Sequence, residues 1–194
     1  MTRRKPYVVQ RMPIFVGCEG ESEAGYVGLL DLAAKAAELP VHLHIERLAP
    51  AGDPLARVER AINKIGRMRG RREPFKHRFI LLDTDQIRLA PERAEQARRL
   101  ARNEGITLIW QEPCFEALLL RHFPGCAAHR PVDNIGTMQA LEREWPNYAK
   151  PQWRMDLARR IDRDAILRAA SVEPGLADLL RVIGLLASQA EAGA

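Results

Sequence analysis

Three acidic residues stand at the ends of two short apolar runs. Glu19 follows the run at 14–18, and Asp83 and Asp85 follow the run at 79–82. Carboxylates suit hard divalent cations such as Mg²⁺ and Mn²⁺, and Mg²⁺ usually takes one or two of them together with water and substrate phosphates. The three acids are therefore candidate ligands for a metal that assists phosphoryl chemistry. The alternative is that each acid only caps the helix that follows it.

Strands and helices alternate over the first two thirds of the chain. Apolar runs and period-two alternation predict strands at 14–18, 41–48, 79–82 and 106–110. Helical spacing and capping residues predict helices at 22–39, with Ser22 as the cap, and at 54–65, 91–104 and 113–123. This order is typical of an α/β domain with a mainly parallel sheet flanked by helices.

The carboxyl ends of parallel strands meet at one edge of the sheet, where ligands bind in such folds. Glu19 and Asp83 end different strands, so this edge can bring them together despite their distance in sequence. In an extended strand, Asp83 and Asp85 would point to the same side. We therefore expect one crevice that holds all three acids.

Four stretches resemble the TOPRIM domains of the RloB-like family, which is related to the nuclease domains of OLD-type proteins. They are IFVGCEGESEAGY at 14–26, ILLDTD at 80–85, QEPCFEALLLRHF at 111–123 and YAKP at 148–151. The third is the most specific, because EG turns and DxD pairs recur by chance. The resemblance covers about 14–150, and it implies a TOPRIM-like Rossmannoid domain at 10–150 followed by a helical C-terminal extension at 151–194.

The resemblance also implies roles for five residues. Glu19 corresponds to the TOPRIM glutamate, Asp83 and Asp85 to its DxD motif, and Glu116 to the acid of the PCFE motif. These four would bind Mg²⁺ or Mn²⁺. Lys150 corresponds to a candidate transition-state lysine, so catalysis would fall to Glu19, the two aspartates and Lys150.

Other interpretations of the acids and the lysine remain open. The turn after Glu19 is short, which leaves the roles of Glu21 and Glu23 undecided. Glu116 lies near the start of a predicted helix, where a carboxylate commonly accepts hydrogen bonds from free backbone N–H groups. Lys150 lies in a loop flanked by proline, where a solvated lysine is equally expected.

A basic segment precedes the strand that carries the DxD motif. Its sequence at 67–78, RMRGRREPFKHR, holds six Lys or Arg residues against one Glu. Beside a metal site, such a segment could follow a phosphate backbone, with contacts from Arg67, Arg69, Arg71, Arg72 and Lys76. The alternative is a solvated helix end and loop, which a charge run usually is.

The composition sets bounds on the partners and the compartment. The chain has 194 residues, 46% of them hydrophobic, and no apolar run approaches the roughly 20 residues of a membrane span. The N-terminus lacks the apolar core of a signal peptide, and three cysteines without CxxC spacing argue against a disulfide framework. We expect a cytoplasmic protein without a membrane partner. A net charge of +5 favours a polyanionic partner such as DNA or RNA.

The end of the chain carries an apolar stripe at helical spacing. Its members are Leu176, Leu179, Leu180, Ile183 and Leu186 or Ala187. The stripe is predicted to pack on the domain's own core, and the alternative is a homodimer through this C-terminal helix.

Three functional hypotheses follow from these features. The first is a Mg²⁺- or Mn²⁺-dependent nuclease, which the resemblance associates with prokaryotic anti-phage or restriction-associated defence. The second is a catalytically weak nucleic-acid-binding or sensor subunit that acts with a partner such as an ATPase, since the chain has no GxxxxGK[ST] motif of its own. The third is a phosphatase of the haloacid dehalogenase type, which ranks last because its DxD motif belongs on the first strand.

Overall fold

The described residues form one parallel sheet of four strands. The computed structural model describes residues 10–50, 52–70, 73–85, 87 and 90–187. The strands are β1 (Met12–Cys18), β2 (Val41–Arg47), β3 (His77–Asp83) and β4 (Thr107–Gln111). Their order across the sheet is β2-β1-β3-β4, and every neighbouring pair is parallel. The strands that carry Glu19 and Asp83 are therefore adjacent.

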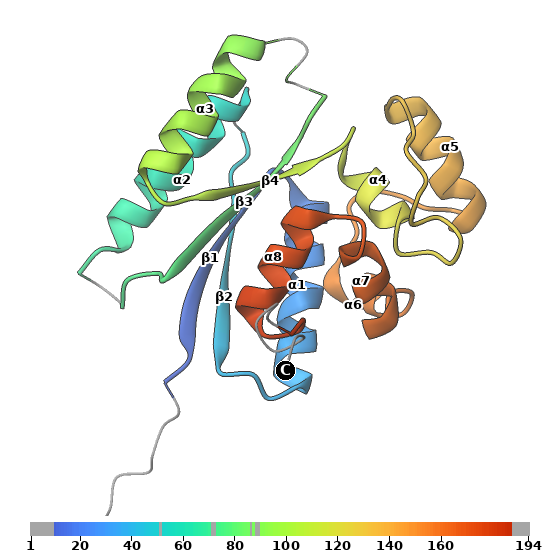
Figure 1. Cartoon of the computed structure of the whole chain (residues 1–194), viewed down its shortest axis with the longest axis horizontal. Helices are drawn as coiled ribbons and strands as arrows, with labels where there is room; N and C mark the ends of the chain where they lie inside the picture. The colour runs from blue at the N-terminus through green and yellow to red at the C-terminus, as the bar shows by residue number, and fades with distance from the viewer. Residues whose placement is uncertain (1–9, 51, 71–72, 86, 88–89, 188–194) are drawn as a thin grey trace, which may run out of the picture.

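Helices cover both faces of this sheet (Figure 1). One face carries α2 (Pro54–Met68) and α3 (Pro91–Asn103), and the other carries α1 (Glu21–Ala36) and the C-terminal α8 (Pro174–Ile183). The remaining helices are α4 (Phe115–Leu120), α5 (Asn134–Glu144), α6 (Arg154–Ala158) and α7 (Arg163–Ala170). The predicted α/β class, with a parallel sheet flanked by helices and followed by C-terminal helices, is confirmed.

Strict alternation along the strands separates two hydrophobic cores. In β3, Phe79 and Leu81 face α1 and α8, whereas Ile80 and Leu82 face α2 and α3. Successive side chains of a strand point to opposite faces of the sheet. Asp83 therefore points to the same face of the sheet as Phe79 and Leu81, the face that α1 covers.

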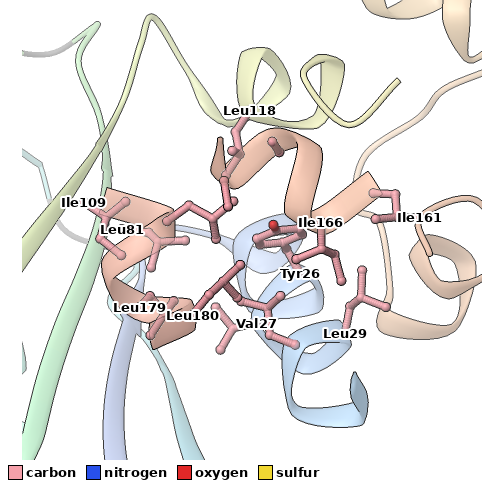
Figure 2. Close-up of a cluster of buried hydrophobic side chains, with 14 of the residues drawn as sticks. Tyr26, Val27, Leu29, Leu81, Ile109, Leu118, Ile161, Ile166, Leu179 and Leu180 are labelled. Atoms are coloured by element: carbon pink, nitrogen blue, oxygen red, sulfur yellow. The ribbon is translucent and has the colours of Figure 1, made fainter. Parts of the chain in front are cut away.

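The C-terminal helices belong to the larger of these cores. Figure 2 shows Leu179 and Leu180 of α8 packed with Val27 of α1, Leu81 of β3 and Ile109 of β4. The stripe on α8 is thus buried within the chain, as expected. The alternative, a homodimer through this C-terminal helix, stays a prediction, and the side chains buried in the core would not be the ones that form it.

Three local expectations were wrong. Ser22 does not cap α1, since the helix starts at Glu21 and the Ser22 hydroxyl instead accepts the backbone N–H of Gln152. The helix after Pro113 is shorter than expected and ends at Leu120. The strand β3 ends at Asp83, so Asp85 lies in the following turn rather than on the strand.

No helix among the described residues is both long enough and apolar enough to cross a membrane.

Candidate functional site

Glu19 and Asp83 meet at the carboxyl edge of the sheet. Because β1 and β3 are parallel neighbours, their ends lie side by side. A carboxylate oxygen of Glu19 accepts the backbone N–H of Asp83 at 3.2 Å. Cys18 points to the face of the sheet that α1 covers. Glu19, the next residue, points to the opposite face, toward α2. The two acids therefore meet at this edge from opposite faces of the sheet.

Two further carboxylates are buried close to Asp83. Glu23 in the first turns of α1 is 6% exposed, and Glu116 in α4 is 1% exposed. Burial, reinforced by the charges of Glu23, Glu19, Asp85 and Glu116, raises the pKa of Asp83 to about 9. The site therefore gathers five acids, and their charges together with burial favour the protonated form of Asp83.

Glu23, rather than Glu21, turns toward the site. Burial and the charges of Glu19 and Glu116 raise the pKa of Glu23 to about 7, against the lowering effect of its own backbone N–H. Glu21 is exposed and forms an ion pair with Arg47 at the end of β2. The short turn after Glu19 thus places the second glutamate of α1 in the acid cluster and leaves the first outside it.

Two cations partly neutralise this cluster. Arg57 in α2, which is 8% exposed, pairs with Glu19 at 2.6 Å and also donates to the Gly52 carbonyl at 2.7 Å. Lys150 pairs with a Glu116 oxygen at 2.7 Å, and the hydroxyl of Tyr148 donates to the same oxygen at 3.0 Å.

Lys150 holds its charge in this position. Burial lowers its pKa, but the hydrogen bond to Glu116 and the negative charge there outweigh burial, so the pKa of Lys150 is raised. The YAKP stretch therefore contributes both a phenol and an ammonium group to the site.

Asp85 lies beside the other four acids. Although it lies in the turn after β3, its charge still raises the pKa values of Glu19 and Asp83. One of its oxygens accepts the side-chain amide of Asn134, at the start of α5, at 3.2 Å. The turn is anchored by the Thr84 N–H, which donates to the carbonyls of Gln111 and Pro113.

The acid cluster fits a hard divalent cation in its chemistry. One buried oxygen each of Asp83 and Asp85 has no hydrogen-bond partner among the described residues. Within that same part of the chain, no three His, Cys, Asp or Glu side chains are close enough together to enclose a metal by themselves. A Mg²⁺ ion held by one or two carboxylates and by water does not need such an enclosure. The two aspartates are the ligands that best suit it.

The basic segment does not lie beside these acids. Lys76 donates its backbone N–H to Pro13, and His77 pairs with Ile14, so the segment enters β3 at the amino edge of the sheet. Arg67 and Arg69 are exposed at the end of α2, whereas Arg71 and Arg72 lie outside the described residues. The expectation that the segment flanks the acids was wrong, because a parallel strand starts at the edge opposite to its end.

Two site residues escaped prediction from the sequence, and the role of a third, Glu23, was left undecided there. Arg57 and Asn134 carry no recognisable pattern, because only the packing of α2 and α5 brings them to the carboxyl edge.

A model of the family described as RloB-like protein matches residues 14–176 of this chain. The match extends past residue 150, where the resembling motifs end, and includes the start of α8. Comparisons with curated proteins and with solved structures found no significant match.

Proposed function

The chain belongs to the RloB-like protein family, and from this premise we propose that it is a Mg²⁺- or Mn²⁺-dependent nuclease that hydrolyses phosphodiester bonds in DNA or RNA. The observation that supports the proposal most is the state of Asp83. Its carboxyl group is buried among four other acids, and one of its oxygens has no hydrogen-bond partner in the described part of the chain. Such a site is strained unless a cation joins it.

In this proposal, Asp83 and Asp85 would hold the cation together with water, and the charges of Glu19 and of Glu116 on the α4 side would add to its stabilisation. A bound Mg²⁺ or Mn²⁺ supplies charge stabilisation at a phosphoryl oxygen and lowers the pKa of water. Glu23, with a pKa of about 7, is suited to accept a proton from an attacking water near neutral pH. Glu19 is the alternative base, because burial raises its pKa as well.

Arg57 and Lys150 provide positive charge on two sides of the acids. Negative charge develops on the phosphoryl oxygens as the bond breaks, and preorganised cations stabilise it strongly in a site that excludes water. Arg57 is the more rigid of the two, because its guanidinium group is buried and bonded to both Glu19 and Gly52. We assign Arg57 and Lys150 to this role, in a protein of anti-phage or restriction-associated defence.

A second candidate is a nucleic-acid-binding or sensor subunit of low activity that acts with a partner such as an ATPase. The observation in its favour is that Arg57 and Lys150 already pair with Glu19 and Glu116. A site neutralised in this way would need a partner or substrate to release its carboxylates.

The test is cleavage of single- and double-stranded DNA and RNA by the purified chain in Mg²⁺ or Mn²⁺. We expect metal-dependent cleavage that Asp83→Asn abolishes and that Asp178→Asn, a change of an exposed surface acid, leaves intact. Cleavage that survives in Asp83→Asn would contradict the proposal. Cleavage that appears only with an added partner would favour the second candidate.

A further inference from the structure

A cleft of about 640 Å³ opens beside the acid cluster. It lies between the ends of β3 and β4 and the start of α5, and its lining includes Asp85, Trp110 and Ile135. Its volume falls within the roughly 300–1,000 Å³ that is usual for small-ligand sites. Asp85 belongs to both the acid cluster and the cleft, so a group bound here lies next to the proposed catalytic centre.

The cleft has flat and apolar walls. Trp110 lies on the side of β4 that faces α3. The guanidinium group of Arg98 lies 5.0 Å from the centre of the Trp110 ring. Val132 and Ile135, which are 79% and 71% exposed, line the same cleft. An aromatic ring, a guanidinium plane and two aliphatic side chains are surfaces on which a planar ring can stack.

The charged part of the lining is mainly acidic. It contains Asp85, Glu112 and Asp133, against the single cation of Arg98 among the described lining residues, and Thr84 and Asn134 add a hydroxyl and an amide. Such a lining repels phosphate. It favours an uncharged planar ring whose amino groups donate hydrogen bonds, which is the chemistry of a nucleobase.

We propose that this cleft binds the base of an unpaired nucleotide adjacent to the bond that is cleaved. The inference rests on the proposed nuclease function and adds a substrate class to it. A base inside a duplex has both faces covered by its neighbours, so entry into the cleft requires a single strand, a loop or a flipped nucleotide. The neighbouring acid cluster, with its bound cation, would then take the phosphate of that nucleotide.

The first experiment measures binding of free adenosine and cytidine to the metal-free protein by calorimetry. We expect both nucleosides to bind and Trp110→Leu to weaken binding by about five- to a hundredfold, the range for loss of an aromatic stacking partner. Ile135→Ser should weaken binding as well, because it removes an apolar side chain from the lining. Trp153→Leu, a change of an exposed tryptophan outside the cleft, should leave the affinity unchanged. Ribose 5-phosphate should not bind.

Three results would overturn the inference. They are absence of nucleoside binding to the wild type, affinities unchanged in both cleft variants, and binding of a cationic probe such as agmatine in place of nucleosides. Because Ile135 is mostly exposed, its variant should fold normally even if Trp110→Leu does not.

A second experiment separates this inference from the nuclease proposal. With a hairpin substrate, the wild type should cut in the unpaired loop, and Ile135→Ser should lose the preference for the loop over the stem. Asp83→Asn should bind nucleosides with unchanged affinity but should cut neither the loop nor the stem of the hairpin. Nucleoside binding without any cleavage would refute the nuclease function and leave the cleft assignment standing, whereas cleavage without preference for the loop would refute the cleft assignment alone.

Discussion

Burial and the neighbouring acids oppose ionisation of Asp83, and the charge of Lys150 offsets them only in part. Water is largely excluded from its carboxyl group, and four other acids lie near enough to repel its charge. Arg57 and Lys150 pair with Glu19 and Glu116 instead. A buried carboxyl group in this position takes a proton or a metal ion, because either one removes the uncompensated charge.

The raised pKa of Asp83 predicts how the stability of the metal-free protein depends on pH. The folded state holds this proton up to about pH 9, whereas the unfolded chain releases it near pH 4. The free energy of unfolding should therefore fall as pH rises between these values, by up to about 1.4 kcal/mol per pH unit from this group. Asp83→Asn should flatten the fall and be the more stable protein at pH 8. Chemical denaturation at pH 5 and pH 8 measures the free energy of unfolding of the wild type and of Asp83→Asn. If both proteins lose the same stability between the two pH values, the raised pKa of Asp83 is contradicted.

Arg57 should act on turnover rather than on substrate affinity. Arg57→Gln removes a preorganised positive group, so kcat should fall by about a hundred- to a thousandfold while KM changes little. Arg93→Gln, which breaks an exposed ion pair with Asp53, is the matched control and should retain full activity. An equal effect of both changes on kcat, or an effect of Arg57→Gln on KM alone, would remove Arg57 from the catalytic role.

The elements were largely predictable because their signals are local. Apolar runs bounded by turns located all four strands, and the proline residues at 54 and 91 marked the starts of α2 and α3 correctly. Strand ends were less predictable, which is why Asp85 was expected on β3 and lies in a turn. The placement of Arg57 and Asn134 depends on how helices pack, and that is not encoded in local periodicity.

The loop at 148–152 depends on a close approach to α1. A Cβ atom at Gly25 would lie 2.1 Å from the backbone carbonyl oxygen of Gln152, so a side chain there must displace the loop. Gly25→Ala should cost about 1–3 kcal/mol of stability and should move Tyr148 and Lys150 away from Glu116. Activity should then fall together with the melting temperature.

Gly66→Ala in α2 is the control for this change. Nothing lies within 4 Å of the added Cβ, so the substitution should stabilise the protein by about 0.5–1 kcal/mol through helix propensity. Thermal melts compare the two variants. A Gly25→Ala protein as stable as Gly66→Ala would show that the loop is not held by this contact.

At the scale of the whole molecule, the acids around Asp83 lie at the carboxyl edge of the sheet, whereas the basic segment enters β3 at the amino edge. The seven residues of β3 carry the chain from Lys76 to Asp83, a distance on the order of 20 Å at about 3.3 Å per residue. Only a nucleic acid that extends across a face of the molecule would touch both. The segment at 67–78 should therefore affect binding of long substrates more than chemistry at the site.

Neutralising Arg69, Arg71 and Arg72 together tests this arrangement. The triple change to Gln should weaken binding of a long duplex and reduce the slope of log K against log salt by up to about 0.9 per lost contact. The rate on a saturating short oligonucleotide should stay the same. An unchanged salt slope would leave the segment as a solvated helix end and loop.

The tail of the chain is part of the same folded body as the site. Leu157, Ile166 and Leu180 share one core with Val16 of β1, and the family match runs through most of this region. The sequence motifs end near 150, so they gave no indication of how firmly the tail is attached. Its helices cover the same face of the sheet as α1, the face toward which Asp83 points.

A thermal melt of the wild type and of Asp83→Asn, each with and without millimolar Mn²⁺, tests the proposed metal site most directly. Mn²⁺ should raise the melting temperature of the wild type, with about 2.7 kcal/mol of stabilisation at a hundredfold excess over the dissociation constant. Asp83→Asn should lose this response while being at least as stable as the wild type without metal. A wild type whose melting temperature is indifferent to Mn²⁺, with an Asp83→Asn protein about 1 kcal/mol less stable, is the pattern of a helix-capping acid and would contradict the metal site.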